Sequence, residues 1–243
     1  MFRMVYPTTL LLPDRGQCTR TGHRYGGNQE SRNMTDAQRR ISSMAMLMFA
    51  LGLTVRARAQ TCAPPPGFID KPPPSIAAPE RLVSHTEQIT VARPLVEVLQ
   101  ANAKVSLKEA IRKAGSLPGV IGEYPLGSLP FPASGARRVV CLSDGSTLQE
   151  QSLGEERTGT SYRFRYIVWN YTSAQARPID YGVGEFRDSQ IDAGHTHIVW
   201  TYSFKLKENA FPGCLGALGR YLFRIGFLDR DYAAMMRATL QGN

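Results

Sequence analysis

The sequence predicts an α+β fold in which an antiparallel sheet, with two short helices after its first strand, closes on one long C-terminal helix. Residues 194–204 alternate in character, so that Ile198, Trp200, Tyr202 and Phe204 share one face of a strand. Several short strands separated by turn signals precede this stretch, as in an antiparallel meander. A long amphipathic segment, residues 213–240, follows it and can cover the face of large side chains.

The N-terminal region predicts export. Residues 1–33 show no sustained period and are expected to be a non-structural upstream extension. Residues 34–59 combine a charged start, an apolar run at 41–55 and the small-residue pattern Ala57-Arg58-Ala59, which is typical of a signal peptide. The apolar run is short for a bilayer span, so no stable membrane insertion is expected after cleavage. We therefore expect a mature chain that starts near Gln60 and is periplasmic or secreted.

The charge distribution argues against nucleic-acid binding. Residues 1–59 hold nine of the 29 Lys and Arg residues and three of the 20 Asp and Glu residues, a net charge of +6. The whole chain carries +9, so residues 60–243 carry only +3. A nucleic-acid-binding domain needs a strongly basic face on the folded part, and none is indicated.

Residues 60–80 contain two runs of three prolines and predict a disordered, stiff Pro-rich arm. The alternative is a docking ligand for an aromatic groove. The folded domain is expected at 81–243 and is long enough to bury a core. Its first strand places Val83, Ile89 and Val91 on one side and ends at Arg93-Pro94. Short helices are expected at 95–104 and 107–114, and further strands at 120–124, 137–142, 147–155, 162–170, 181–189 and 198–205.

Glycines punctuate this pattern. The turn at Asp144-Gly145 indicates a hairpin, because this pair tolerates positive φ. Gly182 and Gly184 suggest a bulge or bend within their strand. In the last segment, apolar side chains recur at steps of three and four, and Leu222 and Ile225 are expected to face the sheet near the middle of the helix. The residues expected on this buried face are Leu215, Leu218, Leu222, Ile225, Leu228, Tyr232, Met235 and Thr239.

Four cysteines are present, and no pair has the spacing of metal ligands. A Cys141–Cys214 disulfide in an oxidising compartment and buried free thiols are both compatible with the sequence. Cys62 would remain without a partner, and Cys18 lies in the upstream extension.

The order of elements, with the phrases LPGV (117–120), PLG (125–127), GARRV (135–139), LSDG (142–145) and WTYSF (200–204), resembles bacterial members of the SRPBCC superfamily, of the polyketide cyclase/dehydrase-like branch. The resemblance covers about residues 81–240. It implies the START-like helix-grip fold, in which the sheet is curved and wraps around the last helix with a cavity between them, and no shared catalytic residue. Residues 95–120 lack the aromatic residues that many members carry after the first strand, so the cavity mouth is expected to differ.

Candidate chemical groups are few. His195 and His197 share a strand face, but no further ligand is evident, and a solvent-facing strand start is the favoured interpretation. Four carboxylates lie on or near strands and could form an acid/base pair, although outward-facing edge residues are more common. They are Glu150, Glu155, Glu156 and Glu185. Glu185 would be a polar group in the cavity if its strand register turns it inward. No metal and no cofactor is predicted.

The aromatic face opposite a glycine-containing helix predicts a pocket for a small hydrophobic ligand. The expected ligand-binding residues are Tyr162, Phe164, Tyr166, Glu185, Ile198, Trp200, Tyr202 and Leu222. The first hypothesis is therefore an exported small-molecule-binding protein. The second is a cyclase- or aromatase-like enzyme, for which no catalytic residue is evident. The third is a periplasmic accessory protein of a dehydrogenase, because the superfamily includes such a protein and a protein partner is compatible with the sequence.

Overall fold

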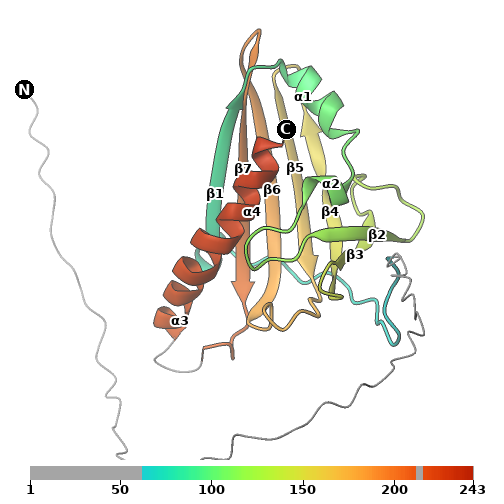
Figure 1. Ribbon diagram of the computed structural model, residues 1–243, viewed down its shortest axis with the longest axis vertical. Coiled ribbons are helices and arrows are strands. Elements are labelled where there is room, and N and C mark those ends of the chain that lie inside the picture. The colour runs from blue at the N-terminus through green and yellow to red at the C-terminus, as the bar shows by residue number, and fades with distance from the viewer. Residues whose placement is uncertain (1–61, 212–215, 243) are drawn as a thin grey trace, which may run out of the picture. The chain divides into compact units, whose positions relative to one another are not determined.

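The computed structural model describes residues 62–211 and 216–242, so the predicted upstream extension and signal peptide lie outside the described residues. A seven-stranded antiparallel sheet, in the order β1-β7-β6-β5-β4-β3-β2, curves around a C-terminal helix (Figure 1). The predicted helix-grip fold is confirmed. We call the sheet face toward this helix the inner face and the opposite face the outer face. None of the described helices is long and apolar enough to cross a membrane.

The strands lie close to their predicted positions. They are β1 (Val83–Val91), β2 (Val120–Leu126), β3 (Arg137–Leu142), β4 (Thr147–Arg157), β5 (Ser161–Trp169), β6 (Ile179–Asp192) and β7 (His195–Leu206). In β7, burial alternates residue by residue, and Ile198, Trp200, Tyr202 and Phe204 are all buried on the inner face as predicted. The alternation in sequence thus marks the side of the sheet that carries the core.

A one-turn 3-10 helix, η1 (Pro79–Arg81), precedes β1, and two short helices follow it. Helix α1 (Leu95–Asn102) buries Leu95 and Val98 as predicted. Helix α2 (Leu107–Ala110) begins with a capping box between Ser106 and Glu109 and is shorter than expected. It ends early because the carbonyl of Ile111 accepts a hydrogen bond from Val120 N at the start of β2. This bond draws the chain into the sheet before a second turn can form.

The C-terminal helix has three consecutive parts, α3 (Gly216–Phe223), the π-helical η3 (Arg224–Tyr232) and α4 (Ala233–Gln241). The expected positions of Leu222 and Ile225 against the sheet are wrong, because their residue surfaces are 52 and 44% exposed, whereas Phe223 is buried. The wider turns of a π-helix shift the phase of every residue before them. Leu228 and Met236 are fully buried, but counting back from them with a constant α-helical period selects the wrong face of α3.

The predicted bulge at Gly182 and Gly184 is also not found. The pairing of β6 with β7 runs without interruption from Tyr181 to Gln190. The glycines serve close packing instead. A Cβ on Gly184 would lie 2.1 Å from Tyr166 Cζ, and one on Gly182 would lie 2.6 Å from Tyr202 Cε1. Two aromatic rings of the inner face therefore lie directly against the β6 backbone.

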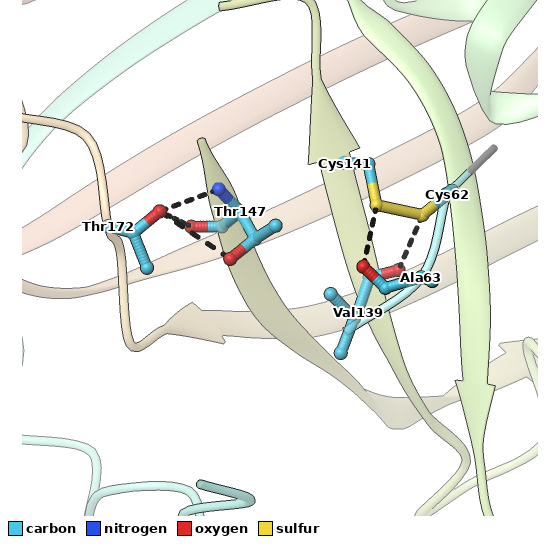
Figure 2. Close-up of a disulfide and its surroundings, with 6 residues drawn as sticks. All are labelled: Cys62, Ala63, Val139, Cys141, Thr147 and Thr172. Atoms are coloured by element: carbon cyan, nitrogen blue, oxygen red, sulfur yellow. Dashed lines mark hydrogen bonds between the residues drawn. A yellow bond between two sulfur atoms is a disulfide. The ribbon is translucent and has the colours of Figure 1, made fainter. Parts of the chain in front are cut away.

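The cysteine pairing differs from both alternatives left open by the sequence. Cys141 of β3 forms a disulfide with Cys62, with 5.5 Å between the Cα atoms (Figure 2). Cys214 lies outside the described residues. The pairing could not be inferred from spacing, because the partners are 79 residues apart and Cys62 belongs to the Pro-rich segment.

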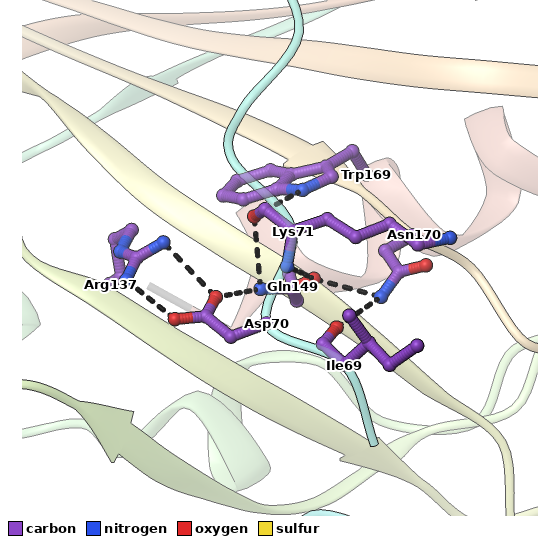
Figure 3. Close-up of polar contacts among 7 residues, drawn as sticks. All are labelled: Ile69, Asp70, Lys71, Arg137, Gln149, Trp169 and Asn170. Atoms are coloured by element: carbon purple, nitrogen blue, oxygen red, sulfur yellow. Dashed lines mark hydrogen bonds and ion pairs between the residues drawn. The ribbon is translucent and has the colours of Figure 1, made fainter. Parts of the chain in front are cut away.

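The disorder expected for residues 60–80 is not seen in their described part. Residues 62–78 form no helix or strand, yet they bond to the outer face of the sheet (Figure 3). Arg137 donates to both carboxylate oxygens of Asp70, at 3.0 and 2.7 Å, and Trp169 Nε1 donates to the Lys71 carbonyl at 3.2 Å. Prolines lack the N–H that strand pairing needs, so this segment forms no strand and docks through carbonyls, side chains and the N–H groups of Lys71 and Ala77.

Candidate ligand cavity

A cavity of about 270 Å³ lies between the inner face, the C-terminal helix and α2. Its lining is mostly aromatic and aliphatic, as is typical of sites for small apolar molecules. Strands β3 to β7 supply one wall, α2 and the segment after it supply the rim, and Phe227, Tyr232, Met235 and Thr239 come from the helix. The chain segment between β5 and β6 closes one end with Tyr171, Ser173, Gln175 and Ala176.

The strand register assembles the aromatic wall. Phe164 of β5 pairs with Phe186 of β6, which pairs with Trp200 of β7. The rings of Phe186 and Trp200 stack with centroids 4.7 Å apart. One pair further along the strands, Gly184 stands between Tyr166 and Tyr202. Because Gly184 has no side chain, the Tyr166 ring occupies the space above it, and Trp200 Nε1 donates to the Tyr166 hydroxyl at 3.2 Å.

Tyrosine hydroxyls supply most of the polarity inside. Burial raises the pKa values of Tyr166, Tyr171 and Tyr202, so these hydroxyls stay protonated and can donate. The Tyr202 ring lies 4.9 Å from the Tyr232 ring on the helix. The buried Tyr171 hydroxyl has no hydrogen-bond partner of good geometry among the described residues. A buried donor of this kind is normally satisfied by a ligand group or an ordered water.

One ion pair reaches the cavity. Arg138 Nε donates to Glu150 Oε2 at 2.5 Å, and the same guanidinium contacts Glu123 and lies 3.5 Å from the centroid of the Phe131 ring. Burial raises the pKa of Glu150, and the adjacent Arg138 opposes that rise. With two carboxylates and one guanidinium, this cluster can hold a polar group of a ligand or exchange a proton with it.

Four of the predicted ligand-binding residues line the cavity, namely Phe164, Tyr166, Trp200 and Tyr202. The other four do not. Ile198 is buried on the same face but beyond the lining, and Leu222 points to solvent. Tyr162 lies at the start of β5, outside the lining, and its hydroxyl donates to Glu155 Oε2 at 2.9 Å. Glu185 is on the outer face.

The position of Glu185 follows from register. It shares parity with Val183 and Arg187, which face away from the helix. Three arginines surround its carboxylate there, Arg163 at 3.0 Å, Arg165 at 3.2 Å and Arg187. Burial alone would raise the pKa of Glu185, but hydrogen bonds from Arg163 and Arg187 outweigh it and hold the pKa below its ordinary value. These ion pairs stabilise the Glu185 carboxylate on the outer face, so Glu185 cannot contact a ligand in the cavity.

Arg138 was not among the predicted site residues, and Glu150 was named only as one of four carboxylates that could form an acid/base pair. A signal for both was present in the hairpin at Asp144-Gly145. With the three-residue loop that the structure has, residues 143–145, the ladder pairs Arg138 directly with Glu150, whereas a two-residue turn at Asp144-Gly145 would pair Arg138 with Gln151. Opposite charges facing each other across two strands are a recognisable stabilising pair. Their burial, however, depends on which face the core covers.

The described residues contain no group of three or more His, Cys, Asp or Glu side chains that could hold a metal ion. His195 bonds to Asp192 beside it at 2.9 Å and is exposed. His197 lies 3.3 Å from the Thr90 hydroxyl on the outer face. The half-site considered for these two histidines therefore has no third ligand in the described part of the chain.

Comparison with known proteins adds similarities of fold. No protein-family model matches the sequence, and no curated protein matches it. Similar solved structures include Ara h 8.0201, at 15% identity and a TM-score of 0.41 over 66% of this chain and 99% of that one. The Zhui aromatase/cyclase from Streptomyces sp. R1128 matches at 16% identity and 0.44, over 66% and 93%. A norcoclaurine synthase mutant from Thalictrum matches at 9% and 0.39, over 66% and 97%.

Proposed function

We propose that this chain is a carrier or sensor that binds a small apolar molecule in the cavity between the inner face and the C-terminal helix. The observation that carries the proposal is the cavity itself, an apolar space of about 270 Å³ beside the buried Tyr171 hydroxyl, which makes no hydrogen bond of good geometry with any described residue. Protein interiors are normally close-packed, so an apolar cavity of this size is typical of a ligand site. A ligand would fill the cavity and accept a hydrogen bond from the Tyr171 hydroxyl.

The chemistry of the cavity lining indicates which class of ligand would fit. Stacked rings along β5 to β7 favour a flat or ring-containing apolar molecule. The protonated hydroxyls of Tyr171 and Tyr202 favour an acceptor, such as a carbonyl or hydroxyl oxygen, near the loop end. Arg138 favours a second polar group near β3.

The test uses the protein's own fluorescence. The chain has two tryptophans, of which Trp200 lines the cavity and Trp169 bonds to the Pro-rich segment on the outer face. In a Trp169→Phe background, titration with an environment-sensitive naphthalene probe should change the Trp200 emission in a saturable way. Ala176→Phe, which adds a ring to the lining, should abolish that change while the cooperative melting transition remains.

Leu222→Ala is the matched control, because it also alters an apolar residue but one that is outside the lining. It should bind the probe as the parent does. Equal probe binding by the parent and the Ala176→Phe variant would reject the cavity as the ligand site. Native mass spectrometry of the purified protein would then identify any ligand retained from the cell.

The Arg138–Glu150 pair favours a second candidate, a cyclase- or aromatase-like reaction in the same cavity. Glu150 lies in the lining with a raised pKa, which suits a proton-transfer group that can reach a bound substrate. Conversion of a co-purified ligand by the native protein and not by Glu150→Gln, with binding retained in both, would support the enzyme. Unchanged ligand in both cases supports the carrier.

Export of the chain forms part of the proposal. The pattern of residues 34–59 supports a signal peptide, and the Cys62–Cys141 disulfide supports an oxidising compartment such as the periplasm or the exterior. Cleavage after Ala59 would leave Cys62 as the third residue of the mature chain, so the disulfide would tie the new terminus to β3. N-terminal sequencing of exported protein should begin near Gln60, whereas a soluble cytoplasmic protein that retains Met34 would contradict export.

A further inference from the structure

The first half of the C-terminal helix turns large apolar side chains to solvent. Leu218, Tyr221, Leu222 and Ile225 are 51, 59, 52 and 44% exposed. Their spacing places them along one face of the helix, and we call them the apolar stripe. Single exposed apolar residues are ordinary, but a contiguous group of four marks a surface that contacts something else. None of the four lines the cavity.

A positively charged groove lies beside this stripe, where β1 begins and β7 ends. Tyr221 lines the groove as well as belonging to the stripe. Five of the residues lining it are basic and two are acidic. The basic ones are Arg81, Lys205, Lys207, Arg220 and Arg224, and the acidic ones are Glu80 and Glu208. We call this the basic groove.

The basic groove keeps a net positive charge after its carboxylates are counted. Arg81 pairs with Glu208 at 3.5 Å, and Arg224 lies 3.5 Å from Asp229, both on exposed side chains. Lys207 and Arg220 make no ion pair with any described residue. The groove therefore presents an excess of positive charge directly beside exposed apolar side chains.

We propose that the apolar stripe and the basic groove together bind the surface of a lipid bilayer that contains anionic headgroups. The stripe would enter the boundary between headgroups and acyl chains, and the arginines and lysines would pair with lipid phosphates. Tyr221, with an apolar ring and a polar tip, suits the interface between the two regions. The site lies on the solvent side of the helix and does not depend on what the cavity holds.

Charge decides between a bilayer and a second copy of the chain. A symmetric dimer through the stripe would place the same surface of each copy against the other and bring two basic grooves together. Like charges across such an interface oppose association. An anionic bilayer offers both complementary charge and an apolar layer, so it fits the whole surface and not only the stripe.

The test must report on this helix alone, because the apolar residues 41–55 can also bind lipid. Hydrogen exchange of the full-length chain would be measured with and without vesicles of phosphatidylcholine mixed with phosphatidylglycerol. We expect the amides of α3 to gain protection with the mixed vesicles, less so as salt is added and much less with phosphatidylcholine alone. Leu222→Glu combined with Ile225→Glu should raise the lipid concentration needed for half of this protection by about tenfold or more.

Arg220→Gln should raise that concentration by about fivefold, since it removes one cation near the lipid surface. Ile191→Glu is the matched control, since Ile191 is 59% exposed near the end of β6 and lies outside the stripe. It should behave like the parent. Equal protection by neutral vesicles, equal protection in the Leu222/Ile225 variant, or a dimer that Leu222→Glu dissociates would overturn the proposal. Naphthalene probe binding by the same variants should be unchanged, which separates this result from any failure of the cavity.

Discussion

The two tryptophans of this chain lie on opposite faces of one sheet and are bonded in different ways. Trp169 of β5 is 3% exposed, and its Nε1 donates to a backbone carbonyl of the Pro-rich segment at 3.2 Å. Trp200 of β7 is 1% exposed, and its Nε1 donates to the Tyr166 hydroxyl at the same distance. The outer face is thus covered by a backbone segment with fixed partners, whereas the inner face is covered by side chains that leave a cavity.

The polar groups under the Pro-rich segment and those of the inner face show the same difference. On the outer face, the amide of Gln149 donates to Asp70 at 2.6 Å and accepts from Lys71 N at 3.2 Å and from Asn170 at 2.8 Å. In the cavity wall and beside it on the inner face, the Tyr171 hydroxyl and one carboxylate oxygen of Asp188 are buried without a hydrogen-bond partner among the described residues. The Nε atoms of Arg163 and Arg165, on the outer face away from the Pro-rich segment, are also buried without a hydrogen bond, although both guanidinium groups pair with Glu185. A complete polar network indicates a permanent contact, and an incomplete one indicates a place where something else binds or titrates.

Removing core packing from the inner face should have the largest effect. Leu228 lies on the buried side of the C-terminal helix and is fully buried, so Leu228→Ala should lower the free energy of unfolding by about 2–5 kcal/mol. Leu222→Ala is the matched change on the exposed side and should cost less than about 0.5 kcal/mol. Urea unfolding of both variants checks the pair. Equal losses would mean that the helix is rotated from the position described.

The unpaired carboxyl of Asp188 should make stability depend on pH. It lies on β6 between Tyr162 and Ile198, and burial raises its pKa from 3.8 to about 7. From about pH 4 to about pH 7, the folded state keeps a proton that the unfolded state releases, so stability falls as pH rises. Asp188→Asn should remove this fall and stabilise the protein at about pH 8 by up to about 4 kcal/mol.

Unfolding at several pH values tests this contribution, and Glu185→Gln provides the contrast. Burial favours protonation of Glu185, but hydrogen bonds from Arg163 and Arg187 outweigh burial and lower its pKa below the ordinary value. Its contribution is therefore present at neutral pH and lost as pH falls, the opposite sign from Asp188. The same pH slope in the parent and in Asp188→Asn would contradict the assignment.

Breaking the disulfide should release the Pro-rich segment from the outer face and leave the cavity on the inner face unchanged. Cys62→Ser opens a loop with a sequence separation of 79 residues, and loss of a native disulfide costs about 2–4 kcal/mol. The Trp169 fluorescence should move toward that of an exposed indole, because the segment that covers it is freed. Naphthalene probe binding at Trp200 should be retained. Loss of both signals together would show that the two faces are not independent.

Adding one methyl group to the inner face should have the smallest effect of these changes. Gly184→Ala would place a Cβ 2.1 Å from Tyr166 Cζ, and the buried ring must move, at a cost of about 1–3 kcal/mol. Gly226→Ala is the control, because nothing lies within 4 Å of its added Cβ and a helical alanine is favoured. It should be neutral or slightly stabilising in the same thermal melt. The two variants should also differ in probe binding, which only the first alters.

Much of the cavity could be predicted from local pattern. The alternation of large residues in β5 and β7 correctly placed Phe164, Tyr166, Trp200 and Tyr202 on one inner face, and their size correctly indicated a pocket opposite the helix. Glu185 was misplaced because a two-residue period gives which residues share a face and not which face is covered. Gly182 and Gly184 of β6 were interpreted as a bulge or bend. The aromatic rings that pack on them come from other strands, so this close packing is not visible in the sequence around the glycines.

The sequence by itself determined the strands, the hairpin at Asp144-Gly145 and the helix that covers the sheet, because periodicity and turn chemistry are local properties. Only the tertiary structure decided the π-helical phase of η3, the pairing of Cys62 with Cys141 and the meeting of the Pro-rich segment with Gln149. Each of these depends on residues far apart in the chain or on the packing of a whole element. The two cysteines, and likewise the Pro-rich segment and Gln149, are too far apart in the chain for a local pattern to include both, so these contacts form only when the sheet has folded.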